Sequence, residues 1–185
     1  MLGTSSRQNH PITPNMLAAI RRSVDLTVPC HAALWTLFTT AFFSSLRKSN
    51  LVATSAPSFN CDLHVSRRDI KFTDAGVLLR IKWSKTRQFN EGVHIILLRS
   101  IPRSPLCPVS AIHHYCALVP APPKAPFFCL PADRRPGFTP LSTSYFTTSL
   151  KQFIASSAWI QETTLHTISG GEEQLTHVKR VFQNI

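Results

Sequence analysis

The sequence predicts a mixed α+β domain that is mostly helical and contains a small three-stranded antiparallel sheet. Apolar residues recur at three- and four-residue intervals in four separate segments, which is the spacing of helices with a buried face. Between the second and third of these segments, apolar and polar residues alternate as in half-buried strands. With 185 residues, 43% of them hydrophobic, the chain is long enough for the core of one domain.

Two helices are predicted before residue 50. Thr13 followed by Pro14 is a typical helix start, and the first helix is expected to run to about Leu26. Its core stripe is Met16, Leu17, Ile20 and Val24. The second, from about Pro29 to Leu46, is apolar on most of its circumference and is expected to be largely buried.

Arg47 and Lys48 follow this apolar helix directly. Two interpretations of them are open. The cations can interact with the negative end of the helix dipole, which stabilises an exposed helix by a few tenths of a kcal/mol. Alternatively, the Arg47 guanidinium belongs to a site that binds an anion.

Three strands are predicted in the middle of the chain, at residues 64–72, 77–85 and 93–98, with a turn at 74–76 and a loop at 86–92. Their order in the sequence favours a three-stranded antiparallel sheet. In the second strand, Val77, Leu79, Ile81 and Trp83 are expected on one face, and Arg80, Lys82 and Ser84 on the other. Lys85 is expected at the tip of the hairpin.

The last third is predicted to contain two further helices. One starts at Pro108 with a core stripe of Val109, Ile112, Tyr115, Cys116 and Val119. Residues 127–130 are expected to form a short buried strand, followed by a basic turn at 132–140. Ser142 or Thr143 caps the last helix, with Phe146, Leu150, Phe153 and Ile154 as its stripe. Tyr115 and Tyr145 are expected to be core or groove residues.

The charge balance suits a polyanionic partner. Lysine and arginine number 20 against nine aspartate and glutamate, so the formal net charge is +11. This charge is concentrated between Arg47 and Arg103, and a small acidic substrate explains it poorly. The candidates for contacts with a DNA backbone are Arg67, Arg68, Arg80, Lys82 and Arg87.

The cysteines favour a reducing, intracellular location. There are five, with no CxxC pair, which argues against a disulfide framework and a zinc ribbon. Cys107, His113, His114 and Cys116 match no usual zinc spacing, so neither a metal nor another cofactor is expected.

The sequence has no apolar run of eighteen residues and no signal-peptide core, so no membrane association is expected.

Several motifs occur in a recognisable order. They are an apolar helix ending in Leu46-Arg47, a basic strand, a hairpin with Ser84-Lys85-Thr86 at its tip, the helix start Leu106-Cys107-Pro108-Val109, and a late His166. This order resembles the catalytic domain of the tyrosine recombinases, the phage integrase superfamily, in particular its Crypton-like and DIRS-like eukaryotic mobile-element branch. The resemblance runs from about Pro11 to His166. It implies a DNA breaking-rejoining fold, double-stranded DNA as the partner, a role in DNA recombination and integration, and a nuclear location; self-association on DNA is left open.

The resemblance also implies a phosphate site. In this family two arginines hold the scissile phosphate, a hairpin lysine protonates the leaving 5′ oxygen, and a downstream tyrosine attacks. The matching positions here are Arg47, Lys85 and His166, which form a remnant catalytic site. For Lys85, a contact with the DNA backbone alone is the open alternative.

The match fails after His166. The family has His-x-x-Arg at this point, but Ser169 stands in place of the second arginine. No tyrosine follows Gly171, and Tyr115 and Tyr145 both precede His166. Loss of one transition-state donor typically costs about a hundred- to a thousandfold in rate, and loss of the nucleophile costs more.

We therefore expect a DNA-binding, C-terminally incomplete recombinase-like domain that does not cleave DNA by itself. Residues 1–10 are expected to be disordered or a linker remnant, residues 11–171 the domain, and residues 172–185 a divergent tail. With suitable codons, a shifted frame over 172–183 yields a Gly-Ala-Thr string similar to the family's continuation, so we interpret the tail as a frameshifted or mis-joined end. Two alternatives stay open: a strand-transfer enzyme whose tyrosine comes from a partner chain, and a non-catalytic protein-interaction remnant.

Overall fold

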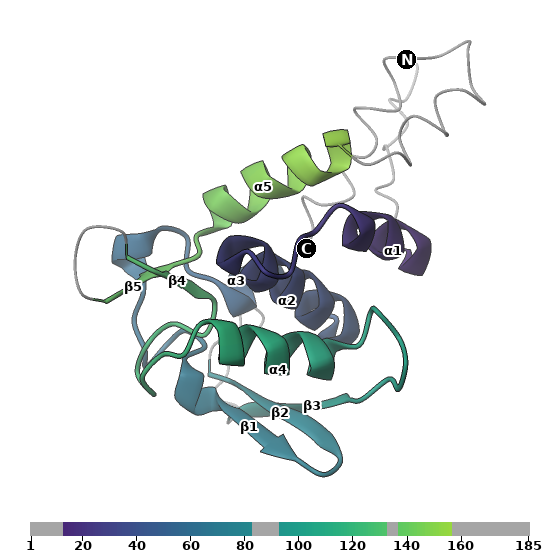
Figure 1. Ribbon diagram of the computed structural model, residues 1–185. Coiled ribbons are helices and arrows are strands. Elements are labelled where there is room, and N and C mark those ends of the chain that lie inside the picture. Colours follow the sequence, from purple (N-terminus) through teal and green to yellow (C-terminus); the bar gives the residue numbers. More distant parts are fainter. Residues whose placement is uncertain (1–12, 83–92, 133–136, 157–185) are drawn as a thin grey trace, which may run out of the picture.

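The computed structural model describes residues 13–82, 93–132 and 137–156 (Figure 1). In chain order, its elements are α1 (Pro14–Arg22), α2 (Pro29–Ser44), α3 (Lys48–Leu51), η1 (Ala56–Ser58), η2 (Arg67–Asp69), β1 (Ile70–Thr73), β2 (Gly76–Ile81), β3 (His94–Arg99), α4 (Pro108–Leu118), β4 (Cys129–Pro131), β5 (Phe138–Pro140) and α5 (Thr143–Ser156). The described residues thus combine five α-helices with a small three-stranded antiparallel sheet, which confirms the predicted α+β class.

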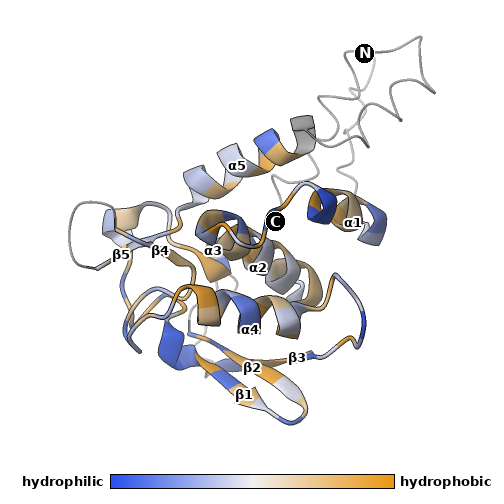
Figure 2. Ribbon diagram, in the orientation of Figure 1, coloured by the Kyte–Doolittle hydropathy of each residue, from blue (hydrophilic) through white to orange (hydrophobic). Residues whose placement is uncertain are grey.

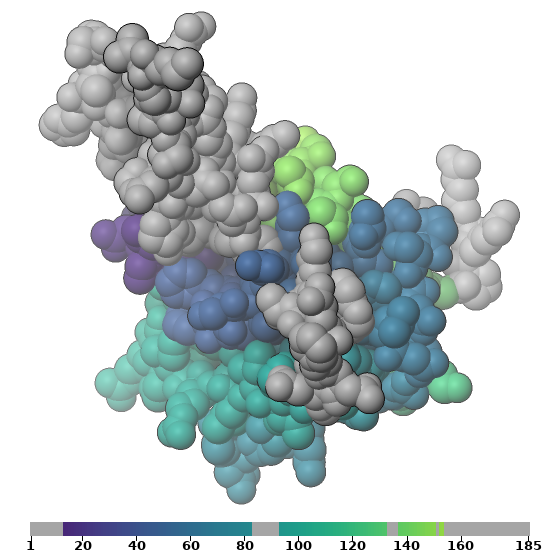
Figure 3. All heavy atoms as spheres, turned by 180° about the vertical axis from the view of Figure 1, so that it is seen from behind, coloured from purple at the N-terminus to yellow at the C-terminus, as the bar shows by residue number. Residues whose placement is uncertain are grey.

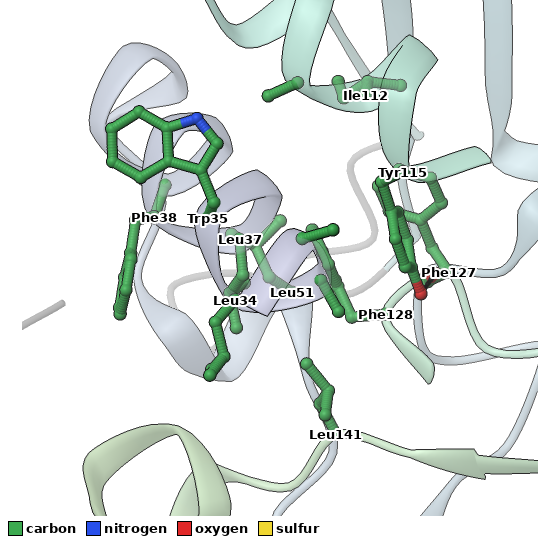
Figure 4. Packing of buried hydrophobic residues seen from close by; sticks show 14 of the residues in the cluster. Leu34, Trp35, Leu37, Phe38, Leu51, Ile112, Tyr115, Phe127, Phe128 and Leu141 are labelled. Carbon is green, nitrogen blue, oxygen red and sulfur yellow. Dashed lines mark hydrogen bonds between the residues drawn. The ribbon is translucent and has the colours of Figure 1, made fainter. Parts of the chain in front are cut away.

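Helix α2 forms the centre of the core. Every residue from Ala32 to Ala41 is buried, including three threonines. A buried hydroxyl without a hydrogen-bond partner is costly. The Thr36 hydroxyl avoids this cost, because it donates to the Ala32 carbonyl at 2.8 Å and also lies 3.1 Å from the Ala111 carbonyl of α4. The close packing of α2 side chains with those of α4 and of the segment around Phe127 is visible in Figure 4.

The elements are arranged in layers (Figure 1). Helix α4 lies between the three-stranded sheet and the α2–α3 region, and α5 lies on the far side of α2 from the sheet. The α5 side chains Phe146, Leu150 and Phe153 are buried as predicted, and the rings of Phe146 and Phe38 lie 5.2 Å apart. Among the described residues, no helix has both the length and the apolarity needed to cross a bilayer.

Both N-terminal helices are shorter than the periodicity suggested. Helix α1 ends at Arg22 and not near Leu26. The Asp25 carboxylate accepts hydrogen bonds from the backbone and hydroxyl of Thr27, and this local turn competes with the helix. Helix α2 ends at Ser44 and not at Leu46, because Ser45 adopts a left-handed conformation with φ of 54°.

The three-stranded sheet has the predicted order, β1–β2–β3, with both pairs antiparallel. On β2, Val77, Leu79 and Ile81 are buried and Arg80 is exposed, as expected from the alternation. The first strand, however, begins at Ile70 and not at residue 64.

The chain before Ile70 forms a turn because of two side chains. The Asp69 carboxylate accepts hydrogen bonds from the Ser66 amide at 2.8 Å and the Ser66 hydroxyl at 2.6 Å. This capping arrangement favours the 3₁₀ turn η2 over an extended chain.

The C-terminal half contains one strand that the sequence patterns did not indicate. Residues 132–140 were expected to be only a turn, but Phe138–Pro140 forms β5 and pairs with β4. Helix α4 begins at Pro108 as predicted, and the Ser142 hydroxyl accepts from the Tyr145 amide at the start of α5.

The two tyrosines have different environments. Tyr115 is fully buried, which confirms its predicted core position; its hydroxyl lies 2.6 Å from the Cys129 carbonyl and accepts from the Cys129 amide at 2.8 Å. Burial raises the pKa of Tyr115, so its hydroxyl stays protonated. Tyr145 is 39% exposed and lies at the surface.

Candidate nucleic-acid interface

Arg47 lies in the exposed link between α2 and α3. It is the N-cap residue of α3, three positions after the last residue of α2, so it does not close α2 as the sequence suggested. Its side chain is exposed, and among the described residues no hydrogen bond or ion pair engages its guanidinium. From behind, the blue α2–α3 region of the chain reaches the surface (Figure 3). A guanidinium in this setting is available to an anion.

Lys82 does not share the solvent-exposed position of Arg80. Strand β2 ends at Ile81, and the half-buried Lys82 turns inward, where its ammonium pairs with the Asp69 carboxylate at 2.5 Å. It also donates to the carbonyls of Cys61 and His64, at 2.5 and 3.3 Å. Lys82 was predicted on the same face as Arg80 but differs from it in burial, since a buried carboxylate draws the ammonium inward. A DNA contact by Lys82, still a prediction, would require these bonds to break.

Arg67 is held inside the fold in a comparable way. Its guanidinium lies 4.5 Å from the centre of the Tyr115 ring and donates to the Val119 carbonyl at 2.9 Å. It also donates to the Cys116 thiol at 2.9 Å. Burial raises the pKa of the Cys116 thiol, although the neighbouring guanidinium opposes this shift. These contacts tie η2 to the C-terminal end of α4, which gives Arg67 a structural role whatever its part in DNA binding.

Arg68 and Arg80 are exposed. Arg68 pairs with Asp62 at 2.7 Å in a bridge whose side chains are both open to solvent, so the bridge contributes little to stability. This hydrogen bond to Asp62 raises the pKa of Arg68. Arg80 points away from the core on β2. Both side chains therefore remain candidates for phosphate contacts.

Lys85, Arg87 and His166 lie outside the described residues, as does Ser169. Of the three predicted catalytic positions, the structure thus describes only Arg47. The predicted convergence of Arg47, Lys85 and His166 on one phosphate stays a prediction.

Two basic residues escaped the sequence interpretation. Lys71 and Arg99 are exposed on β1 and β3, the strands that flank Arg80 on β2. Arg99 stands alone in its local sequence, and Lys71 follows the Arg67-Arg68 pair without being singled out from it. The register that brings them onto one face with Arg80 was the signal needed to find them.

Each of the four residues considered as a metal cluster, Cys107, His113, His114 and Cys116, contacts a different part of the fold. Cys107 caps α4, Cys116 contacts Arg67, and His113 stacks with Phe72 at 4.1 Å between ring centres. His114 is bonded through Nε2 to the Leu26 carbonyl at 2.8 Å. Among the described residues, no group of three or more histidine, cysteine or acidic side chains is placed to hold a metal ion. All five cysteines are free thiols.

Cys107 has a perturbed pKa. Burial by itself would raise the pKa of this thiol, but hydrogen bonds from Ser110, the Ile101 amide and the Ser100 hydroxyl outweigh burial and lower it to about 7. The Ile101 amide lies 3.2 Å from the sulfur. At neutral pH the thiol at the start of α4 is thus partly ionised although it is buried.

Exposed cations outnumber exposed acids over the described part of the chain. The exposed cations are Arg22, Arg47, Arg68, Lys71, Arg80, Arg99, Arg103 and Lys124. The four acidic residues there are Asp25, Asp62, Asp69 and Asp74, of which Asp69 is buried against Lys82 and Asp62 pairs with Arg68. The described surface is therefore strongly positive, which favours association with polyanions.

No family model matches the chain, and no curated protein matches it significantly.

Proposed function

We propose that this chain is a DNA-binding domain of the tyrosine-recombinase type, of mobile-element origin, that binds duplex DNA in the nucleus and does not cleave it by itself. Arg47, with Lys85 and His166, forms the remnant of its phosphate site. Loss of cleavage is inferred from Ser169, which stands where the family has its second arginine.

The observation that carries the proposal is the exposed Arg47 guanidinium. An arginine at the end of a buried helix that served only the helix dipole would interact with the last carbonyls of α2. The chain instead reverses at Ser45, and Arg47 caps the next short helix without a side-chain hydrogen bond. A guanidinium that is exposed, and that has no hydrogen-bond partner within the described residues, is well suited to bind a phosphate oxygen.

The order of the elements also supports the proposal. The recombinase resemblance requires a buried helix, an arginine, a three-stranded antiparallel sheet with a lysine between its second and third strands, and then another helix. In this chain α2, Arg47, β1–β3 and α4 follow one another in that order, and Lys85 falls within the β2–β3 connection.

The first experiment measures DNA binding and covalent-adduct formation for the wild type and for Arg47→Ala. We expect wild-type affinity for a duplex to fall steeply with salt, because phosphate contacts release counterions, and we expect no covalent adduct on a suicide substrate. Arg47→Ala should weaken duplex binding by roughly tenfold, as expected for the loss of a charge-assisted phosphate contact.

The matched control is Arg22→Ala, which removes an exposed arginine from the end of α1. Both variants lack a described side-chain hydrogen bond at the altered position, so both should fold normally. Equal effects of the two substitutions would contradict a specific site at Arg47. A reproducible adduct would overturn the loss of cleavage, and weak, salt-insensitive binding would favour a protein-interaction role.

A further inference from the structure

The solvent face of the three-stranded sheet forms a cationic surface. The register places Lys71 opposite Leu78, Arg80 opposite Ile95, and Arg99 opposite Gly76. Because directly opposed residues, and residues two apart along a strand, point to the same side, these three cations share one face. We call Lys71, Arg80 and Arg99 the sheet cations.

This face is open to solvent while the other face is buried. Lys71, Arg80 and Arg99 are all exposed, and the neighbouring Ile95 is 66% exposed. On the opposite face, Val77, Leu79, Ile81 and Leu98 are at most 2% exposed, and that face is turned toward the helices (Figure 1). Blue bands on the sheet strands mark hydrophilic positions among apolar ones (Figure 2).

The face carries no acidic residue to balance the sheet cations. A solvated sheet face ordinarily gains stability from opposite charges in neighbouring positions. Here the strand positions on this face hold only cations, aliphatic residues, threonine and glycine. Two acids border the strands: Asp69, which precedes β1 and is buried in its pair with Lys82, and Asp74 in the β1–β2 turn. No described hydrogen bond or ion pair engages the three charged groups, so they repel one another until an anion binds.

The spacing of the sheet cations suits a chain of phosphates. Lys71 and Arg80 are diagonal neighbours on adjacent strands, a position in which two residues lie about 7–8 Å apart. Arg99 lies four residues beyond Ile95, the partner of Arg80, or about 14 Å along the strand direction. Measured along the axis of the double helix, that length corresponds to about four phosphates of one DNA strand, each of which adds about 3.4 Å of axial rise.

We propose that the sheet cations bind the sugar-phosphate backbone of duplex DNA, as a contact surface separate from the Arg47 phosphate site. This inference rests on the proposed function and adds a second region of contact to it. The chemistry favours nucleic acid over a protein partner, because protein interfaces have an apolar or aromatic centre. On this face Leu78 and Leu97 are only half-exposed, and the 66% exposed Ile95 is a single aliphatic side chain opposite Arg80. The aromatic residue of β1, Phe72, packs against His113 of α4 instead.

The test uses the full chain with Lys71→Gln, Arg80→Gln and Arg99→Gln combined. Duplex affinity is measured over a series of potassium chloride concentrations. Three lost phosphate contacts should lower the slope of log affinity against log salt by about 2 to 3 and weaken binding at low salt at least tenfold. Binding of the same duplex by Arg47→Ala is measured in parallel, because that variant should keep the sheet contacts.

The matched control combines Arg22→Gln, Arg103→Asn and Lys124→Gln. These residues are also exposed, the charge change is the same, and they belong to three separate segments. Asparagine is chosen at position 103 because φ there is 60°, which asparagine tolerates well. The control should lower the slope by less than 1, since scattered charges do not follow one DNA strand.

Each outcome bears on a different claim. Equal slopes for the two triple variants, with intact wild-type binding, would overturn the sheet surface and leave the proposed function standing. A wild type without salt-dependent duplex binding would overturn both. Polyaspartate is added as a competitor at equal charge concentration. If it displaces the duplex from the wild type but not from the sheet variant, the occupant of the sheet surface is an acidic protein, and the DNA assignment is overturned.

Discussion

Hydrogen bonds to its sulfur atom lower the pKa of Cys107. Three neighbours, Ser100, Ile101 and Ser110, direct donors at this buried atom, and the pKa falls to about 7 in spite of burial. An unfolded cysteine has a pKa of about 8.5. Because the folded-state pKa is the lower one, the ionised thiol stabilises the fold, and this contribution is present above pH 8.5 and lost as the pH falls through 7.

Replacing Cys107 by serine should remove this pH dependence. The free energy of unfolding of the wild type is expected to rise between pH 6.5 and 9 by about 1–2 kcal/mol more than that of Cys107→Ser. Urea denaturation at several pH values measures the difference. Serine retains an N-cap oxygen, so the variant should still form α4. Parallel pH profiles for the two proteins would show that Cys107 stays a neutral thiol.

Elements end where a backbone or side-chain detail interrupts their periodic pattern. Ser45, with its positive φ, ends α2 two residues before the apolar stripe does. The Asp69 carboxylate turns the chain into η2 and delays the first strand to Ile70. At the next turn, Gly76 has φ of 137°, and a Cβ atom there would lie 2.1 Å from the Leu98 carbonyl oxygen on β3.

Gly76→Ala should therefore destabilise the sheet strongly. We expect a loss of about 3 kcal/mol or more, from backbone strain together with the clash against β3. Gly137→Ala is the matched control, because Gly137 has the same φ of 137° but no heavy atom within 4 Å of the added Cβ. The control should lose only the strain contribution, about 1–3 kcal/mol. Denaturant unfolding compares the two variants, and an equal loss would show that β3 moves aside to accept the methyl group.

Across the whole molecule, polar side chains connect segments far apart in the sequence. Arg67 joins η2 to the end of α4, and Tyr115 joins α4 to β4. Lys82 joins the end of β2 to the 61–66 loop and to Asp69, whose side chain is fully buried. The Oδ1 atom of Asp69 is buried without a hydrogen-bond partner among the described residues, so this carboxylate depends on Lys82.

Breaking the Lys82–Asp69 pair from one side should be costly. Lys82→Met leaves the Asp69 charge buried and uncompensated, and we expect a loss of about 3–5 kcal/mol in the free energy of unfolding. Adding Asp69→Asn to this variant should recover part of the loss, because asparagine removes the charge and can still accept from Ser66.

The control for this pair is Arg68→Met, which breaks the exposed bridge to Asp62 and should cost less than 1 kcal/mol. Chemical denaturation of all four proteins gives the values. If Lys82→Met cost no more than Arg68→Met, water would be solvating Asp69, and the pair would not hold the loop in place.

How much of this structure was predictable depends on the range of the interaction. The start of α1 at Thr13-Pro14, the buried α2, the order of the three strands and the start of α4 at Pro108 follow from local periodicity and capping, and all were predicted. The element ends and β5 were missed, because they depend on single turns and on pairing between segments.

The candidate interface divides in the same way. Sequence alone determined the class of the domain, its positive charge and the exposure of Arg80, since alternation on a strand is a local property. Only the tertiary structure decided that Lys82 and Arg67 turn inward while Lys71 and Arg99 join Arg80 on one open face. The physical reason is that a buried carboxylate or aromatic ring, distant in the chain or across a turn, draws a basic side chain inward. Packing and strand register decide which basic residue meets such a partner.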